Sequence, residues 1–136
     1  DLKKVLRAEA IVYGRLPLMI TENCLVQNET GCRLDRQGPW VPTDGPCRRG
    51  QANTLVDRTG AAFPLLPAYG HRTEIQNSRP LYLADRPDYR KLGLSLARLR
   101  FTTETAEECV SVLRSYLDGA PAAGTFTRGL YERGVE

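Results

Sequence analysis

The chain has 136 residues, 41% of them hydrophobic, and its 19 basic and 16 acidic side chains give a net charge of +3. This length suits one compact domain, and the hydrophobic share excludes wholesale disorder. The mild charge neither requires nor excludes a nucleic-acid partner. Because no apolar run reaches the about 20 residues of a membrane helix and no export signal opens the sequence, we expect a cytoplasmic domain with no membrane partner.

The first half of the chain predicts a strand, an irregular segment and a hairpin. Glu9–Met19 has the β-branched and aromatic content of a strand. Thr21–Gly50 is punctuated by glycine and proline, which predicts an irregular segment of unusual length. Asn53–Val56 and Ala61–Leu66 flank the turn sequence DRTG, whose aspartate and glycine suit a hairpin.

The second half predicts alternating strands and helices. Ile75–Ala84 has strand composition, Pro87–Leu92 follows as a short helical segment, and Ser95–Phe101 alternates apolar and polar residues as a strand does. Thr105 and Glu108 have the spacing of a capping box, which predicts a helix running to about residue 118.

Strand–helix–strand–helix order over residues 75–118 is the order of parallel βα units. The predicted fold class is therefore α/β to α+β, a mixed sheet with barrel-like βα units near the C-terminus. Residues 20–70 form an inserted cysteine-rich region with irregular and hairpin parts, and residues 119–136 form a tail. We expect these parts to make up one domain.

Four cysteines and one histidine carry the metal-binding chemistry of the chain. Cys109 falls on the apolar stripe of the last predicted helix, where a small buried side chain is the expected role. Cys24, Cys32 and Cys47 lie in the irregular segment, and with His71 they form a soft ligand set suited to zinc or an iron–sulfur cluster. Their spacing lacks the tight Cys-x2-Cys pair of most structural zinc sites. Unpaired loop cysteines and one disulfide therefore stay open as alternatives.

Motifs of common hydrolases and nucleotide-binding enzymes are absent from the sequence. It contains no His-Glu-x-x-His, no Gly-x-Ser-x-Gly and no P-loop. With a single histidine, any Ser-His-Asp or Cys-His arrangement would have to use His71. Independent catalysis is therefore not expected.

Two polar residues are candidate substrate-binding groups. Arg15 follows Gly14 at the end of a predicted strand, where barrel active sites collect their residues, and could clamp a carboxylate or phosphate; a surface or ion-paired arginine is the alternative. Asn77 stands close before Pro80 at a strand start and could bind substrate or the backbone of the insertion. Arginine supplies 16 of the 19 basic residues, which either favours phosphate and carboxylate recognition or reflects codon usage.

Several short motifs, in one order, resemble the U32 peptidase (collagenase-like protease) family. They are VYGRLPLM over 12–19, LVDR over 55–58, FPL over 63–65, IQNSRPL over 75–81, RLRFT over 98–102 and FTRG over 126–129. The resemblance implies that the chain is the C-terminal segment of a long U32 protein with a barrel-like βα architecture.

The same resemblance implies a cofactor and partners. Some family members carry a peptidase label, and others resemble iron–sulfur-dependent hydroxylation factors that act on ribosomal or transfer RNA. Cys24, Cys32 and Cys47 match cluster cysteines of such proteins, and His71 stands where relatives carry a fourth cysteine. The implied cofactor is zinc or an iron–sulfur cluster. The implied partners are the rest of the parent chain, RNA, and a second copy joined through unpaired sheet edges.

Overall fold

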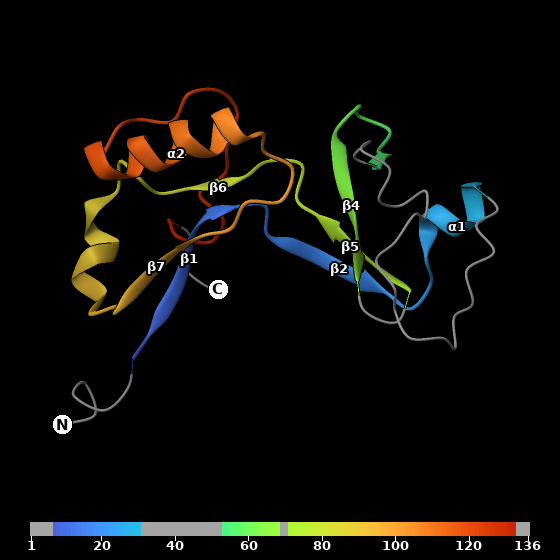
Figure 1. The fold of residues 1–136 in the computed structure, drawn as a ribbon, viewed down its shortest axis with the longest axis horizontal. Helices are drawn as coiled ribbons and strands as arrows, with labels where there is room; N and C mark the ends of the chain where they lie inside the picture. Colours follow the sequence, from blue (N-terminus) through green and yellow to red (C-terminus); the bar gives the residue numbers. More distant parts are fainter. Residues whose placement is uncertain (1–6, 31–52, 69–70, 133–136) are drawn as a thin grey trace. The chain divides into compact units, whose positions relative to one another are not determined.

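The computed structural model describes residues 7–30, 53–68 and 71–132, which form two compact units (Figure 1). Unit 1 comprises the described residues up to Arg15 and from Arg79 onward, and unit 2 lies within Leu16–Ser78. Unit 1 has a three-stranded sheet and unit 2 a four-stranded sheet. The fold is thus mixed α+β, with two sheets and two α-helices, and neither sheet closes into a barrel in the described ranges.

The sheet of unit 1 has the order β6-β1-β7. Its central strand β1 (Glu9–Gly14) pairs antiparallel with β6 (Leu81–Tyr82) and parallel with β7 (Leu96–Leu99). The 3-10 helix η2 (Pro87–Leu92) connects β6 to β7, and α2 (Ala106–Asp118) follows β7 and runs alongside the sheet (Figure 1).

Capping at both ends of α2 confirms the predicted helix. Glu108 N–H donates to Thr105 Oγ1 at 3.3 Å, and Thr105 N–H donates to Glu108 Oε2 at 2.7 Å, which completes the capping box. Gly119 ends the helix with a φ of 66°, a left-handed conformation that glycine adopts without a Cβ clash.

Tyrosine rings occupy the centre of the unit 1 core. The rings of Tyr13, Tyr82 and Tyr116 pack in edge-on and tilted arrangements, with centroids 5.5 to 6.4 Å apart. The Tyr116 hydroxyl accepts from Leu83 N–H at 2.8 Å and donates to the carbonyl of Val12. Val12 lies where the β1–β7 register shifts, so this hydroxyl binds a backbone carbonyl at an irregular point of the ladder.

The predicted apolar stripe of α2 is only partly buried. Tyr116 faces the sheet and is buried, and Cys109 is half-buried. Val110 and Leu113 are each 49% exposed, and Leu117 is 75% exposed. Because Tyr116 bonds to backbone groups of the sheet, it fixes the rotation of the helix and leaves the smaller apolar residues at the rim.

Unit 2 is built on an antiparallel sheet of order β2-β5-β4-β3. The strands are β2 (Pro17–Thr21), β3 (Thr54–Val56), β4 (Ala62–Ala68) and β5 (Arg72–Gln76). The short helix α1 (Leu25–Thr30) follows β2, inside the segment that the sequence predicted to be irregular. In the described ranges of both units, each helix is too short or too polar to cross a membrane.

The hairpin of β3 and β4 confirms the sequence prediction. Asp57 Oδ1 accepts N–H bonds from Thr59 at 2.7 Å and Ala61 at 2.9 Å, and Gly60 has a φ of 83°. Hydrogen bonds from the Thr59 hydroxyl and the Ala61 amide hold the pKa of Asp57 below its usual range. The ionised carboxylate therefore organises the turn.

Two predicted strands were wrong in their extent. Glu9–Met19 divides into β1 and β2, and Ile75–Ala84 divides into the end of β5 and β6, with each pair belonging to different sheets. Gly14 ends β1 with a φ of 121°, a value that L side chains rarely adopt. Pro80 directly precedes β6 and cannot donate to a ladder.

The predicted run of parallel βα units was therefore wrong for β6, which is antiparallel to β1. Among the described strands of unit 1, β7, which is followed by α2, has the expected parallel direction relative to β1.

Candidate functional site

A cavity of about 430 Å³ opens where the parallel strands β1 and β7 end in unit 1. Tyr13 and Arg15 line it from the end of β1, and Thr103 and Glu104 line it from the segment after β7. Residues of α2 between Glu108 and Ser115, Pro80 and Tyr82 at β6, and residues 122–126 complete the walls. The carboxyl ends of parallel strands are where open α/β sheets bind ligands. We call this site the strand-end cavity.

Arg15 is a half-buried residue of the strand-end cavity. Its Nε donates to Thr103 Oγ1 at 3.3 Å, and its carbonyl accepts from Arg100 Nη1 at 3.2 Å. The first bond links the residue after β1 to the segment after β7 and orients the guanidinium. Arg15 directly follows the last residue of β1; its role in substrate binding stays a prediction.

Glu104, in the segment after β7, makes a second connection to β1. Its Oε2 accepts N–H bonds from Thr102 at 2.7 Å and Thr103 at 3.0 Å, and its Oε1 accepts from the Tyr13 hydroxyl at 3.2 Å. Burial, and then the negative charge of Glu104, raises the pKa of Tyr13 well above its usual range. The phenol therefore stays protonated and acts as a donor.

The described lining of the strand-end cavity combines charged, hydroxyl and aromatic groups. One cation, Arg15, faces the same space as two carboxylates, Glu104 and Glu108. The other polar and aromatic members are Tyr13, Tyr82, Thr103, Ser111, Ser115, Thr125 and Phe126. Sequence reasoning missed the two glutamates as site residues: the capping box already accounted for Glu108, and Glu104 meets Tyr13 only through a contact across 91 positions.

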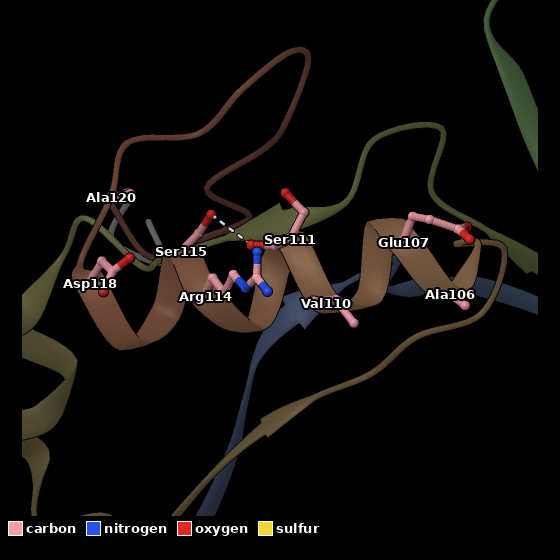
Figure 2. Close-up of a pocket in the computed structure, with 8 residues that line it drawn as sticks. All are labelled: Ala106, Glu107, Val110, Ser111, Arg114, Ser115, Asp118 and Ala120. Carbon is pink, nitrogen blue, oxygen red and sulfur yellow. Dashed lines mark hydrogen bonds between the residues drawn. The ribbon is translucent and has the colours of Figure 1, made fainter.

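A second depression, of about 550 Å³, lies on the outer face of α2 (Figure 2). Seven of its eight lining residues belong to this helix, and the eighth is Ala120. Its polar groups include Glu107, Arg114 and the Ser115 hydroxyl, which donates to the carbonyl of Ser111 at 3.0 Å. Because a single helix supplies almost all of its lining, this depression is a weaker candidate for a site than the strand-end cavity.

Two of the four predicted metal ligands are described, and both belong to unit 2. Thr21, at the end of β2, pairs with Thr73 near the start of β5. Cys24 comes shortly after Thr21 and His71 shortly before Thr73, so both lie at the same end of the sheet. Leu25 N–H donates to Thr73 Oγ1 at 3.0 Å, which ties the residue after Cys24 to β5. Cys24 and His71 are both half-buried.

An ion pair adds to this connection: Arg72 Nη2 lies 3.0 Å from Glu22 Oε2. His71 itself has a φ of 57°, an uncommon conformation for a residue other than glycine.

The remaining predicted ligands, Cys32 and Cys47, lie outside the described residues. Within the described ranges, no three His, Cys, Asp or Glu side chains gather in a group that could hold a metal ion. The four-residue metal site therefore stays a prediction. Asn77, the other predicted substrate residue, belongs to unit 2, where its N–H donates to the carbonyl of Leu16 at 2.9 Å; its role in substrate binding also stays a prediction.

Comparisons of the chain with protein-family models, curated proteins and solved structures found no match.

Proposed function

We propose that the chain is a metal-binding domain, the C-terminal segment of a protein of the U32 peptidase type, without catalytic machinery of its own. One observation carries the proposal: Cys24 and His71 flank the same end of the β2–β5 pair, held there by the bond from Leu25 N–H to Thr73 Oγ1. Two of the four predicted ligands thus share one neighbourhood, although 46 residues separate them in the sequence.

The donor set suits the proposed cofactor. Cysteine thiolates and a neutral imidazole bind zinc, and three thiolates with one imidazole also suit an iron–sulfur cluster. In the proposal Cys24, Cys32, Cys47 and His71 hold the metal. Its contribution would be to order the cysteine-rich region, because a structural metal supplies folding free energy that local packing lacks.

The conformation of His71 supports the same proposal. Residues held in the left-handed region cost free energy and are enriched at functional sites. If His71 binds the metal, coordination would hold its imidazole in a fixed direction, which would explain the uncommon backbone conformation.

The barrel-like part of the proposal is supported by unit 1. β1 and β7 are parallel, and α2 follows β7 directly, which is the local order of a βα unit. We propose that in the full-length protein this part continues a larger βα architecture. The alternative is a hydroxylation factor acting on ribosomal or transfer RNA. Four arginines of the described ranges, Arg72, Arg86, Arg98 and Arg128, pair with carboxylates of this chain and so do not favour it.

Metal content tests the proposal directly. We expect protein purified without oxygen to contain about one zinc per chain, or iron together with acid-labile sulfide. Changing Cys24, Cys32 or Cys47 to serine should lower the metal content. His71→Asn should do the same while preserving the backbone, because asparagine also tolerates a positive φ.

Cys109→Ser is the matched control, since Cys109 belongs to unit 1 and should leave the metal content unchanged. Protein with neither metal, or with a metal content that none of the four ligand variants lowers, would contradict the proposal.

A further inference from the structure

The strand-end cavity of unit 1 presents opposite charges from different elements. Arg15 comes from the end of β1, whereas Glu108 comes from the first turn of α2. A pocket of about 300–1,000 Å³ with a few convergent polar groups is typical of small-molecule sites, and the volume here, about 430 Å³, lies in this range. Its geometry therefore allows a small ligand to contact both charges.

The guanidinium of Arg15 suits a carboxylate. Arginine presents five N–H donors in a planar fork that matches carboxylate geometry, and the bond from Nε to Thr103 Oγ1 orients the fork. The position at the end of a parallel strand is the usual place for such a group.

Two kinds of group at the same cavity suit a cation. Glu108 offers a carboxylate, whose Oε2 also accepts Thr105 N–H, and Tyr82 offers an aromatic ring. Ammonium groups bind over aromatic faces and beside carboxylates. The Phe126 ring already holds the Arg128 guanidinium, 4.5 Å from its centroid. Glu104 adds a second negative charge, although its Oε2 already accepts the N–H groups of Thr102 and Thr103 and its Oε1 accepts from Tyr13.

We propose that the strand-end cavity binds a small zwitterion the size of a free α-amino acid, with the carboxylate at Arg15 and the ammonium at Glu108 and the ring of Tyr82. A phosphate or another plain anion is disfavoured by the two glutamates, and a plain cation is disfavoured by Arg15, because like charges repel at short range. This site is independent of the proposed metal site, which belongs to unit 2.

Three probes of nearly the same size separate the charge classes. L-phenylalanine is the zwitterion, L-phenylalaninamide in its protonated form carries only the positive charge, and 3-phenylpropanoate carries only the negative charge. Each is titrated to about 10 mM into the purified chain while backbone amide signals are followed by nuclear magnetic resonance. L-phenylalanine should shift the signals of Thr103 and Glu104, and each derivative should bind at least about tenfold more weakly, the loss expected for one charge-assisted contact.

Two variants test the assigned roles. Arg15→Gln should weaken L-phenylalanine binding at least about tenfold. Glu108→Gln should also weaken it, and glutamine keeps the capping box of α2, so this variant retains the fold even if Arg15→Gln does not. Arg114→Gln, on the outer face of α2 (Figure 2), is the matched control and should bind as the wild type does.

The proposal is overturned if L-phenylalanine shifts no signals at the cavity, or if either derivative binds as tightly as the zwitterion. An equal loss of binding in Arg114→Gln and Arg15→Gln would also overturn it. None of these results depends on the metal content of unit 2, so the two proposals can fail separately.

Discussion

Arg128 holds the carboxylate of Asp85 by two parallel bonds, from Nη1 to Oδ1 and from Nη2 to Oδ2, each 2.7 Å long. Nη1 also donates to the carbonyl of Tyr82 at 2.6 Å. Tyr82 N–H in turn donates to the carbonyl of Thr127 at 3.1 Å. The segment after α2 is thereby attached to β6 by one ionic and several backbone interactions.

We expect Asp85→Asn to lower the free energy of unfolding by about 1.5–3 kcal/mol, the usual range for a hydrogen bond to a charged group. The side chains of Arg128 and Asp85 are only 17% and 26% exposed, so solvent screens this pair weakly. Urea denaturation followed by near-ultraviolet circular dichroism, which reports on the tyrosine cluster, measures the change. The control is Glu9→Gln, which breaks the ion pair with Arg98, a pair more exposed than Arg128–Asp85, and should cost less than about 1 kcal/mol. Equal losses in both variants would contradict this assignment.

The same pair predicts a pH dependence. The hydrogen bond from Arg128 holds the pKa of Asp85 below its ordinary value, against the opposing effect of burial. A carboxyl group of this kind stabilises the fold above its unfolded pKa of about 3.9, and this contribution is lost as the pH falls through the lower folded pKa. The difference in unfolding free energy between wild type and Asp85→Asn should therefore be constant near neutral pH and shrink below about pH 4. A difference that does not change with pH would count against the pair.

Tyr116→Phe removes a hydroxyl that serves two buried backbone groups, Leu83 N–H and the carbonyl of Val12. We expect a loss of about 2–3 kcal/mol, because the buried groups lose their partner without access to water. Tyr82→Phe is the matched control in the same cluster; its hydroxyl donates to a single carbonyl, that of Ala120, in a half-buried position, and its removal should cost about 1 kcal/mol. The reverse order of the two losses would show that the hydroxyl of Tyr116 does not organise the core.

Gly14→Ala should be the most damaging small substitution in unit 1. An added Cβ would lie 2.1 Å from the carbonyl oxygen of Arg100, and the φ of 121° is unsuited to an L side chain. We expect a loss of about 3 kcal/mol or more, from steric overlap and backbone strain together. Gly93→Ala is the control: its φ is 71° and no atom lies within 4 Å of the added Cβ. It should lose only about 1–2 kcal/mol, and thermal denaturation of both variants makes the comparison.

Local signals in the sequence predicted the elements that depend on local contacts. The capping box of Thr105 and Glu108 and the turn at Asp57 each involve residues within four positions of one another. Their hydrogen bonds join residues close in sequence, so residue types at fixed offsets were sufficient to identify them.

Local sequence signals could not predict that two of the expected strands would each divide between two sheets. Residues on both sides of Arg15 have strand composition, and the break depends on Gly14 and its close approach to Arg100, 86 positions later. The cavity has the same origin, since Glu104 meets Tyr13 across 91 positions. Sequence analysis selected Arg15 because it follows Gly14 in a segment of strand composition, but the partners around it are brought there by tertiary pairing.

Unit 2 occupies one continuous stretch of chain, and the ends of that stretch are neighbours. Leu16 and Asn77 share a backbone hydrogen bond of 2.9 Å, while on the other side of the junctions Gly14 pairs with Leu81 in the sheet of unit 1. Each unit therefore closes on itself, as expected for a module that entered the chain by insertion. A short glycine linker from Arg15 to Arg79 should permit excision of residues 16–78, and residues 16–78 should be transferable into a surface loop of an unrelated scaffold.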